Sequence, residues 1–284
     1  MELWVKEIHQ DKTGLSFKVK QTLFSGKSAF QKVDIIETIG LGRMLLNDGV
    51  FMFSQADEFI YHEMMAHVPL FTHPCPKNVL IIGGGDGGTA REVLKHQSVE
   101  RVVMVEIDEM VVTACREYLP TLSCALNHPK LDLNIGDGVD YAATTKERFD
   151  VILVDSTDPV GSAEPLFNAD FYRNTARILS DDGILITQAE SPFYDGELQR
   201  TMLANQRDFF KYLHLYLFPT LTYPGGLWGF GFASEKYSPI RDFNPERVRT
   251  SGLSFQYYNA DIHRSAFVLP TFIADNLKGI IDPL

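Results

Sequence analysis

Two aspartates that follow an apolar run are the residues best suited to acid–base chemistry. Asp155 and Asp158 stand three residues apart after the run 151–154, with Ser156 and Thr157 between them. Two carboxylates this close repel each other and burial disfavours their charge, so the pKa of one should rise above its usual value of about 3.9. The pair could neutralise a cationic substrate or supply a general base. The alternative is a plain loop that begins with an Asp turn and a Pro.

A glycine-rich turn precedes this pair in the chain. Gly83 opens the turn GGGDGG, residues 83–88, directly after the apolar run 78–82. Such a turn between a strand and a helix is typical of nucleotide and nucleoside sites. Asp86 puts a carboxylate where a pyrophosphate would bind backbone amides, which disfavours NAD, FAD and nucleoside triphosphates and favours an ammonium group. The alternative is that Asp86 only caps the next helix.

Two more acidic residues follow apolar runs. Glu106 comes about twenty residues after the glycines, where an acidic residue usually binds the ribose hydroxyls. Asp137, before Gly138, has a spacing that suits contact with an adenine amino group. If the runs are neighbouring parallel strands, these side chains meet at the carboxyl edge of the sheet, where ligands bind. The predicted ligand is an adenosine without a phosphate chain.

The elements that must position these residues alternate along the chain. Apolar runs and helical patterns follow one another at 78–82, 89–96, 101–108, 109–119, 131–138, 149–159, 171–179, 183–189, 196–210 and 214–218. Such alternation predicts an α/β fold, a parallel sheet with helices on both faces, and uniformly apolar strands fit burial on both sides. The tail from about residue 222 holds further short strand-like runs.

The first residues have a different pattern. Residues 1–55 contain short alternating runs separated by turn residues such as Asn47-Asp48-Gly49, which predicts a small antiparallel β-domain. A helix is predicted over 57–71, with Asp57 as its cap and its end near Pro69. We therefore expect an N-terminal β-domain over 1–55 and a catalytic α/β domain over 56–284, packed together.

Composition excludes several classes of protein. The 284 residues carry a net charge of −11, which disfavours nucleic acid and anionic membranes as partners. No apolar run is long enough to span a bilayer, and charges interrupt residues 1–12, where a signal peptide would be apolar. The cysteines form no CxxC pair and the histidines show no metal-ligand spacing, so we expect no disulfide scaffold and no metal. A cytoplasmic protein with small-molecule substrates is expected.

The ordered motifs resemble a known family. GGGDGG, VEID, GDG and DSTDP, preceded by DEFIYHEMMAHVPLF and followed by PTLTYPGGLWGF, are similar to those of spermidine synthases, in the polyamine aminopropyltransferase family. The resemblance covers nearly the whole chain. It implies a Rossmann-like, methyltransferase-type domain, a homodimer or homotetramer, and no metal or cofactor. The implied reaction transfers the aminopropyl group of decarboxylated S-adenosylmethionine, a co-substrate, to putrescine, giving spermidine and 5'-methylthioadenosine.

The resemblance also implies roles for residues. Those that would hold the methylthioadenosine part are Gln31, Glu106, Asp137 and Gly138. Asp86 and Asp158 would bind the aminopropyl amine or the polyamine, and His62 would be a further polyamine contact. Asp155 would be the proton acceptor. The acceptor pocket would be lined by Tyr61, Gln188, Tyr223 and Trp228, although core packing is the alternative for Tyr61, His62 and the last two.

Some questions stay open at this point. The chain has Ser162-Ala163-Glu164 where many relatives have Pro, so the resemblance does not define the adenine wall. Glu190 and Asp195 could hold a distal ammonium if they point inward. Cadaverine, agmatine and spermidine are alternative acceptors, since one methylene changes binding by only about 1 to 3 kcal/mol. An S-adenosylmethionine methyltransferase and a non-catalytic polyamine-binding protein are the rival functions.

Overall fold

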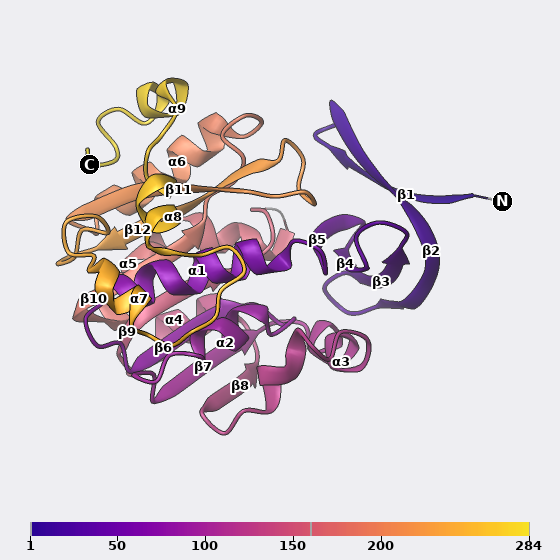
Figure 1. The fold of residues 1–284 in the computed structure, drawn as a ribbon, viewed down its shortest axis with the longest axis horizontal. Helices are drawn as coiled ribbons and strands as arrows, with labels where there is room; N and C mark the ends of the chain where they lie inside the picture. The colour runs from indigo at the N-terminus through magenta and orange to yellow at the C-terminus, as the bar shows by residue number, and fades with distance from the viewer. Residues whose placement is uncertain (1, 160, 284) are drawn as a thin grey trace.

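The chain forms two sheets joined by one long helix (Figure 1). This computed structural model describes residues 2–159 and 161–283, without the side chain of Ser162. The N-terminal sheet is antiparallel and has the order β1-β2-β3-β4-β5. Its strands are β1 (Leu3–His9), β2 (Thr13–Lys27), β3 (Lys32–Thr38), β4 (Arg43–Asn47) and β5 (Val50–Ser54). Asp48 and Gly49 between the last two strands both have positive φ, as a two-residue hairpin turn requires.

The second sheet has seven strands in the order β11-β12-β10-β9-β6-β7-β8. They are β6 (Asn78–Gly83), β7 (Arg101–Glu106), β8 (Leu131–Ile135), β9 (Phe149–Asp155), β10 (Leu179–Gln188), β11 (Tyr212–Pro219) and β12 (Leu227–Ser234). Pairs within β6 to β10 are parallel, while β12 is antiparallel to both of its neighbours. The predicted α/β, Rossmann-like sheet is therefore confirmed, with one reversed strand.

Helices cover both faces of this sheet (Figure 1). They are α1 (Glu58–Thr72), α2 (Gly88–Val93), α3 (Glu109–Tyr118), α4 (Gly138–Thr144), α5 (Ala169–Ile178), α6 (Gly196–Arg207), α7 (Pro245–Arg249), α8 (Ala260–Ala266) and α9 (Thr271–Asn276), with 3-10 turns at Ser123–Asn127 and Gly161–Phe167. Val79 and Ile81 of β6 pack in the core on the α1 side, whereas Leu80 and Ile82 pack in the core under α5 and α6. Successive side chains of a strand point to opposite faces of the sheet, and both faces are buried here, so there is one core on each side.

Helix α1 departs from the prediction at both ends. It continues through Pro69 to Thr72, because burial of Leu70 and Phe71 offsets the backbone hydrogen bond that a proline cannot donate. Asp57 stands at the N-cap position but its side chain caps no helix N–H. Its carboxylate instead accepts hydrogen bonds from the backbone N–H groups of Leu221 and Thr222. Asp57 thereby fixes the loop between β11 and β12 against the start of α1.

The strand order places the acidic residues in one row. Asp155 at the end of β9 is paired with Gly83 at the end of β6, and β6 in turn lies beside β7, which ends at Glu106. β8 follows, and Asp137 comes after it. The carboxyl edge of the sheet thus collects these side chains. Among the described residues, no helix combines the length and the apolar character needed to cross a bilayer.

Candidate active site

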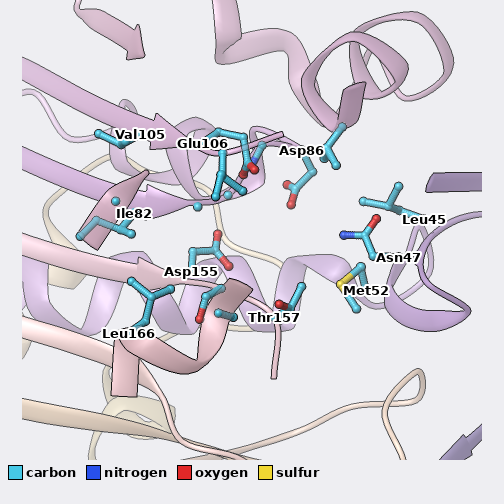
Figure 2. A pocket seen from close by; sticks show the side chains of 18 of the residues that line it. Leu45, Asn47, Met52, Ile82, Asp86, Val105, Glu106, Asp155, Thr157 and Leu166 are labelled. Carbon is cyan, nitrogen blue, oxygen red and sulfur yellow. The ribbon is translucent and has the colours of Figure 1, made fainter. Parts of the chain in front are cut away.

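A cavity lies at the carboxyl edge of the large sheet and is closed from the other side by the N-terminal sheet (Figure 2). The large sheet and its loops supply the polar lining, with Asp86, Glu106, Asp137 and Asp155. Apolar walls come from Ile82, Val105 and Leu166 on the same domain, and from Leu45, Met52 and Phe53 on the N-terminal sheet. An apolar cavity with a few converging polar groups is the usual form of a small-molecule site.

Glu106, which was predicted to bind the ribose, lines this cavity. Its carboxylate accepts hydrogen bonds from the backbone N–H groups of Gly85 and Asp108, both at 2.9 Å. Burial raises the pKa of Glu106 to about 7, although these two hydrogen bonds act in the opposite direction. The backbone of the glycine-rich turn therefore helps to hold the Glu106 carboxylate in place.

Three other residues expected around the nucleoside line the same cavity: Gln31, Asp137 and Gly138. Asp137 caps α4 by accepting a hydrogen bond of 2.7 Å from the Val139 N–H. The Gln31 side-chain amide donates to Asp108, 3.1 Å away. Gln31 lies between β2 and β3, and Asp108 is the N-cap of α3, so this hydrogen bond links the N-terminal region to the part of the chain that carries the large sheet.

Asp155 is held by two hydroxyl groups. The Tyr61 hydroxyl donates to Oδ1 at 2.8 Å and the Thr89 hydroxyl donates to Oδ2 at 2.6 Å. Burial and the nearby charge of Asp86 raise the pKa of Asp155, while His62 and the two hydroxyls act in the opposite direction. A carboxylate with a raised pKa and a fixed orientation is suited to accept a proton. Sequence reasoning missed Thr89, which its place in the first turn after the glycine-rich loop could have indicated.

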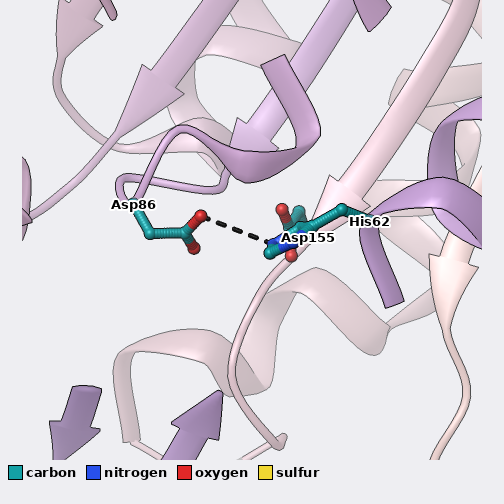
Figure 3. A group of neighbouring side chains, drawn as sticks. All are labelled: His62, Asp86 and Asp155. Atoms are coloured by element: carbon teal, nitrogen blue, oxygen red, sulfur yellow. Dashed lines mark ion pairs between the residues drawn. The ribbon is translucent and has the colours of Figure 1, made fainter. Parts of the chain in front are cut away.

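Asp86 faces His62 across the cavity wall (Figure 3). His62 Nε2 lies 3.4 Å from Asp86 Oδ1, and His62 Nδ1 lies 2.6 Å from Glu58. The Arg91 guanidinium binds both oxygens of Glu58 at 2.9 Å. Burial alone would lower the pKa of His62, but the carboxylates of Asp86 and Glu58 raise it to about 10. At neutral pH this ring therefore carries protons on both nitrogens.

His62, Asp86 and Asp155 also have the residue types of a metal site. Their ligand atoms lie within 4.8 Å of one another. An imidazole protonated on both nitrogens has no lone pair for a metal ion, and its two N–H groups already face carboxylates. The arrangement is therefore better suited to orienting carboxylates than to binding a metal.

A second, smaller cavity adjoins the first. It is lined by Gln188 and Trp228, which were predicted to line the acceptor pocket, and by Asp158, which was predicted to bind the aminopropyl amine or the polyamine. Glu7 of β1 also lines it and was missed by sequence reasoning. Tyr61, Ser156, Thr157 and Tyr223 line both cavities. Burial raises the pKa of Asp158 to about 6, while His9 acts in the opposite direction. Acidic groups beside aromatic walls suit an aliphatic cation.

Glu7, which lines this cavity, makes the stability of the folded protein depend on pH. Burial raises its pKa from 4.5 to about 7, so the folded protein holds this proton where the unfolded chain releases it. The contribution of Glu7 to the free energy of unfolding is fully present below pH 4.5 and is lost as the pH rises through 7. Glu7→Gln should raise the free energy of unfolding by about 1 to 3 kcal/mol more at pH 8 than at pH 5. Urea unfolding at both pH values measures this; an equal change at both would contradict the assignment.

The aromatic residues of the second cavity have structural partners as well. The Tyr223 hydroxyl donates to the Met52 carbonyl at 2.6 Å, and Trp228 Nε1 donates to the Pro224 carbonyl at 3.0 Å. Their polar atoms are thus satisfied by the backbone, and their apolar surfaces are left for the cavity. Tyr223 and Trp228 therefore both contribute to the packing of the protein and line the cavity.

Glu190 and Asp195 lie near this cavity but bind protein groups. Glu190 is 1% exposed, adopts a left-handed φ of 59°, and accepts a hydrogen bond of 2.8 Å from Gln188 Nε2. Asp195 contacts His9 Nε2 at 3.1 Å and the Gln10 side chain, both at the tip of the β1–β2 hairpin. Asp195 therefore fastens the N-terminal hairpin to the catalytic domain.

The segment that departs from the family resemblance lies beside the larger cavity. Ala163 is buried and lines the cavity together with Leu166, so these two side chains supply an apolar wall there. Glu164 is exposed and is not among the residues that line the two cavities. The side chain of Ser162 lies outside the described residues.

A sheet with this strand order and one reversed strand, carrying an acidic cavity at its carboxyl edge, defines the class of Rossmann-like, methyltransferase-type enzymes. Comparison with known proteins narrows this class. Residues 58–244 match the family model of the spermine/spermidine synthase domain. Residues 3–55 match the spermidine synthase tetramerisation domain.

Related proteins match this chain over nearly its whole length. The polyamine aminopropyltransferase of Clostridium kluyveri is 45% identical over 275 residues, covering 97% of this chain and 99% of the relative. That of Methanocaldococcus jannaschii is 44% identical over 284 residues, covering 99% and 97%. A crystal structure of spermidine synthase in complex with the transition state analogue AdoDATO has a TM-score of 0.95 at 42% identity, covering 97% of this chain and 94% of that one. The chain belongs to the spermidine synthase family and is an aminopropyltransferase, as the resemblance predicted.

Proposed function

We propose that this aminopropyltransferase is a spermidine synthase, which transfers the aminopropyl group of decarboxylated S-adenosylmethionine to putrescine. The products would be spermidine and 5'-methylthioadenosine. The observation that carries the proposal is the placement of Asp155: it lines the larger cavity, and its hydrogen-bond partner Tyr61 lines both cavities. A carboxylate there can reach the point where a donor in one cavity meets an acceptor in the other.

The two cavities suit two different cationic substrates. Glu106, Asp137 and Asp86 line the larger one. There Glu106 and Asp137 would bind the adenosine, and Asp86 would supply a negative charge for the donor's amine. In the smaller one, Glu7 and Asp158 are acidic groups between aromatic walls, and a bound diamine would favour their charged forms. The acidic lining offsets the repulsion between the two cations and provides proximity, which can lower a barrier by several kcal/mol.

The mechanism begins with removal of a proton. An aliphatic amine has a pKa of roughly 10 and cannot attack while it is protonated. Asp155 would accept this proton, and Tyr61 would orient the same nitrogen. The nitrogen lone pair then forms a C–N bond to the methylene beside the sulfonium, and the electrons of the C–S bond stay on sulfur. The departing thioether is neutral, so the proposed reaction needs no acid, metal or cofactor.

We also propose a homodimer or homotetramer. The tetramerisation domain of the matching family model spans 3–55. Within that segment, Leu3 and Trp4 on β1 are 54% and 58% exposed, and Ile8 is half exposed. Apolar groups of this size on an outer strand favour burial against another copy.

Ligand-dependent stability and acceptor choice test the proposal together. We expect 5'-methylthioadenosine to raise the melting temperature of the protein more than S-adenosylmethionine does, because a carboxylate near Asp86 is repelled. Release of methylthioadenosine should be fastest with putrescine among putrescine, cadaverine, agmatine and spermidine. A higher kcat/KM for another amine would reassign the acceptor, and stronger stabilisation by S-adenosylmethionine would contradict the assignment of the donor.

A further inference from the structure

The two hydroxyl groups that hold Asp155 come from different helices. Tyr61 lies on α1 and donates to Oδ1, whereas Thr89 lies on α2 and donates to Oδ2. The orientation of this carboxylate therefore depends on how α1 and α2 are placed relative to each other. Helix α2 has only six residues, and its N-cap residue, Gly87, forms no side-chain cap. A helix this short has little stability of its own, so contacts with neighbouring elements must fix its position.

An ion pair between Glu58 and Arg91 joins the same two helices. Glu58 lies on α1, three residues before Tyr61, and Arg91 lies on α2, two residues after Thr89. Two N–H groups of the Arg91 guanidinium donate to the two Glu58 oxygens, each at 2.9 Å. Such a two-pronged pair fixes direction as well as distance. Neither residue is among those that line the two cavities, so the pair can affect the reaction only through other groups.

Glu58 also holds His62, which packs against the start of α2. Glu58 Oε2 lies 2.6 Å from His62 Nδ1, and a Cβ at Gly88 would overlap the His62 ring. Burial alone would raise the pKa of Glu58, but His62 and Arg91 lower it to about 2, so this carboxylate is charged at every working pH. Glu58 thus connects α1 to α2 in two ways, directly through Arg91 and indirectly through His62.

We propose that Glu58 and Arg91 are positioning residues, whose ion pair keeps α1 and α2 at the separation where both hydroxyls reach Asp155. This inference rests on the proposed function, in which Asp155 accepts the proton. Misplacement of a reacting group by about 1 Å can lower a rate about 100-fold. The pair therefore acts on turnover without touching either substrate.

The ionisation of Asp155 should report whether the Glu58–Arg91 pair is intact. Burial and the charge of Asp86 raise the pKa of Asp155, while His62 and the two hydroxyls lower it. Tyr223, from the loop between β11 and β12, stays uncharged because burial raises its pKa. Without Glu58, the hydroxyls would move away from Asp155, and the charge on His62 would lose one of its two carboxylate partners. Both changes raise the pKa of Asp155, so the pH below which turnover is lost should rise.

Two substitutions test the pair: Glu58→Gln removes its negative charge and keeps the shape, whereas Arg91→Lys keeps the positive charge but cannot bind both oxygens. Release of methylthioadenosine would be measured with whichever of putrescine, cadaverine, agmatine and spermidine reacts fastest. In both variants kcat should fall about 10- to 100-fold, while the KM of each substrate changes less than about threefold. In Glu58→Gln the acid limb of the kcat profile should also move up by about one pH unit. The double variant should lose no more kcat than Glu58→Gln alone, since the two residues act as one unit.

Glu92→Gln is the matched control, because Glu92 also joins the two helices. It accepts a hydrogen bond of 2.8 Å from Arg91 Nε and lies 3.1 Å from His67 Nε2 on α1, but it is one residue further from Thr89 along α2. Glu92 is 1% exposed, so its substitution should lower the melting temperature at least as much as Glu58→Gln does. Its kcat and pH profile should equal those of the wild type.

Unchanged kcat in Glu58→Gln, a change in KM alone, additive losses in the double variant, or an equal loss of kcat in Glu92→Gln would each overturn the inference. If Glu58→Gln does not fold, Arg91→Lys decides by its own kcat and KM. Asp155→Asn is assayed in parallel. Near-normal turnover in Asp155→Asn refutes the proposed role of Asp155, whereas slow turnover there beside normal turnover in Glu58→Gln refutes this inference alone.

Discussion

Asp155→Asn should lower turnover by about 10² to 10⁴, the usual effect of removing a general base. Asn has the same shape, and the hydroxyls of Tyr61 and Thr89, which now donate to Asp155, can reorient to satisfy an amide. Folding should therefore be preserved while the proton acceptor is lost. Binding of 5'-methylthioadenosine should change little, because Glu106 and the other nucleoside residues stay in place. Steady-state release of methylthioadenosine measures the first effect, and calorimetry measures the second.

Asp181→Asn is the control for this substitution, since the side chain of Asp181 is 98% exposed and forms an exposed ion pair with Arg148. Exposed ion pairs contribute little, so turnover should equal that of the wild type. Near-normal turnover in Asp155→Asn would show that another group accepts the proton. Loss of turnover together with loss of methylthioadenosine binding would indicate a disturbed fold instead.

Gly83→Ala should destabilise the protein by about 2 to 5 kcal/mol. Gly83 has a φ of 85°, which is unfavourable for any residue with a Cβ. The new Cβ would also collide with the Asp155 carbonyl oxygen, which already accepts a hydrogen bond from the Gly84 N–H at 2.9 Å. Relief of this collision requires the ends of β6 and β9 to separate, and that movement displaces Asp155. Denaturant unfolding should show the loss of stability, and turnover should fall with it.

The contribution of the backbone alone can be measured at Gly49. It has the same φ of 85°, but a Cβ there would meet no atom within 4 Å. Gly49→Ala should therefore cost only about 1 to 2 kcal/mol and leave turnover unchanged. Equal destabilisation by the two substitutions would contradict the close packing of the end of β6 against Asp155.

The catalytic sheet could be predicted because its strands carry their signal locally. Runs such as 78–82 and 151–154 are apolar throughout, as parallel strands buried on both faces must be. The acidic residues after these runs were predicted to share one edge, and the structure brings them to one cavity. β12 gave no such signal: its direction is set by pairing with β10 and β11, which depends on distant segments.

Contributions from the N-terminal sheet were not predictable in the same way. Leu45, Asn47 and Met52 alternate with residues that face elsewhere, and a period of two does not show which face will meet another sheet. Asp57 precedes a helix, where a capping role is the local expectation, but its carboxylate binds the loop at Leu221 and Thr222. Contacts between segments that are distant in the sequence therefore determine which side chains of the N-terminal sheet face the cavity and which groups Asp57 binds.

The formation of products from a labelled acceptor tests the central claim most directly. The wild-type protein would be incubated with decarboxylated S-adenosylmethionine and isotopically labelled putrescine, and the products would be quantified by mass spectrometry. We predict labelled spermidine and 5'-methylthioadenosine in equal amounts, with the formation of both slowed about 10² to 10⁴-fold in Asp155→Asn. Methylthioadenosine without labelled spermidine, or no reaction of putrescine while another amine is consumed, would contradict the account.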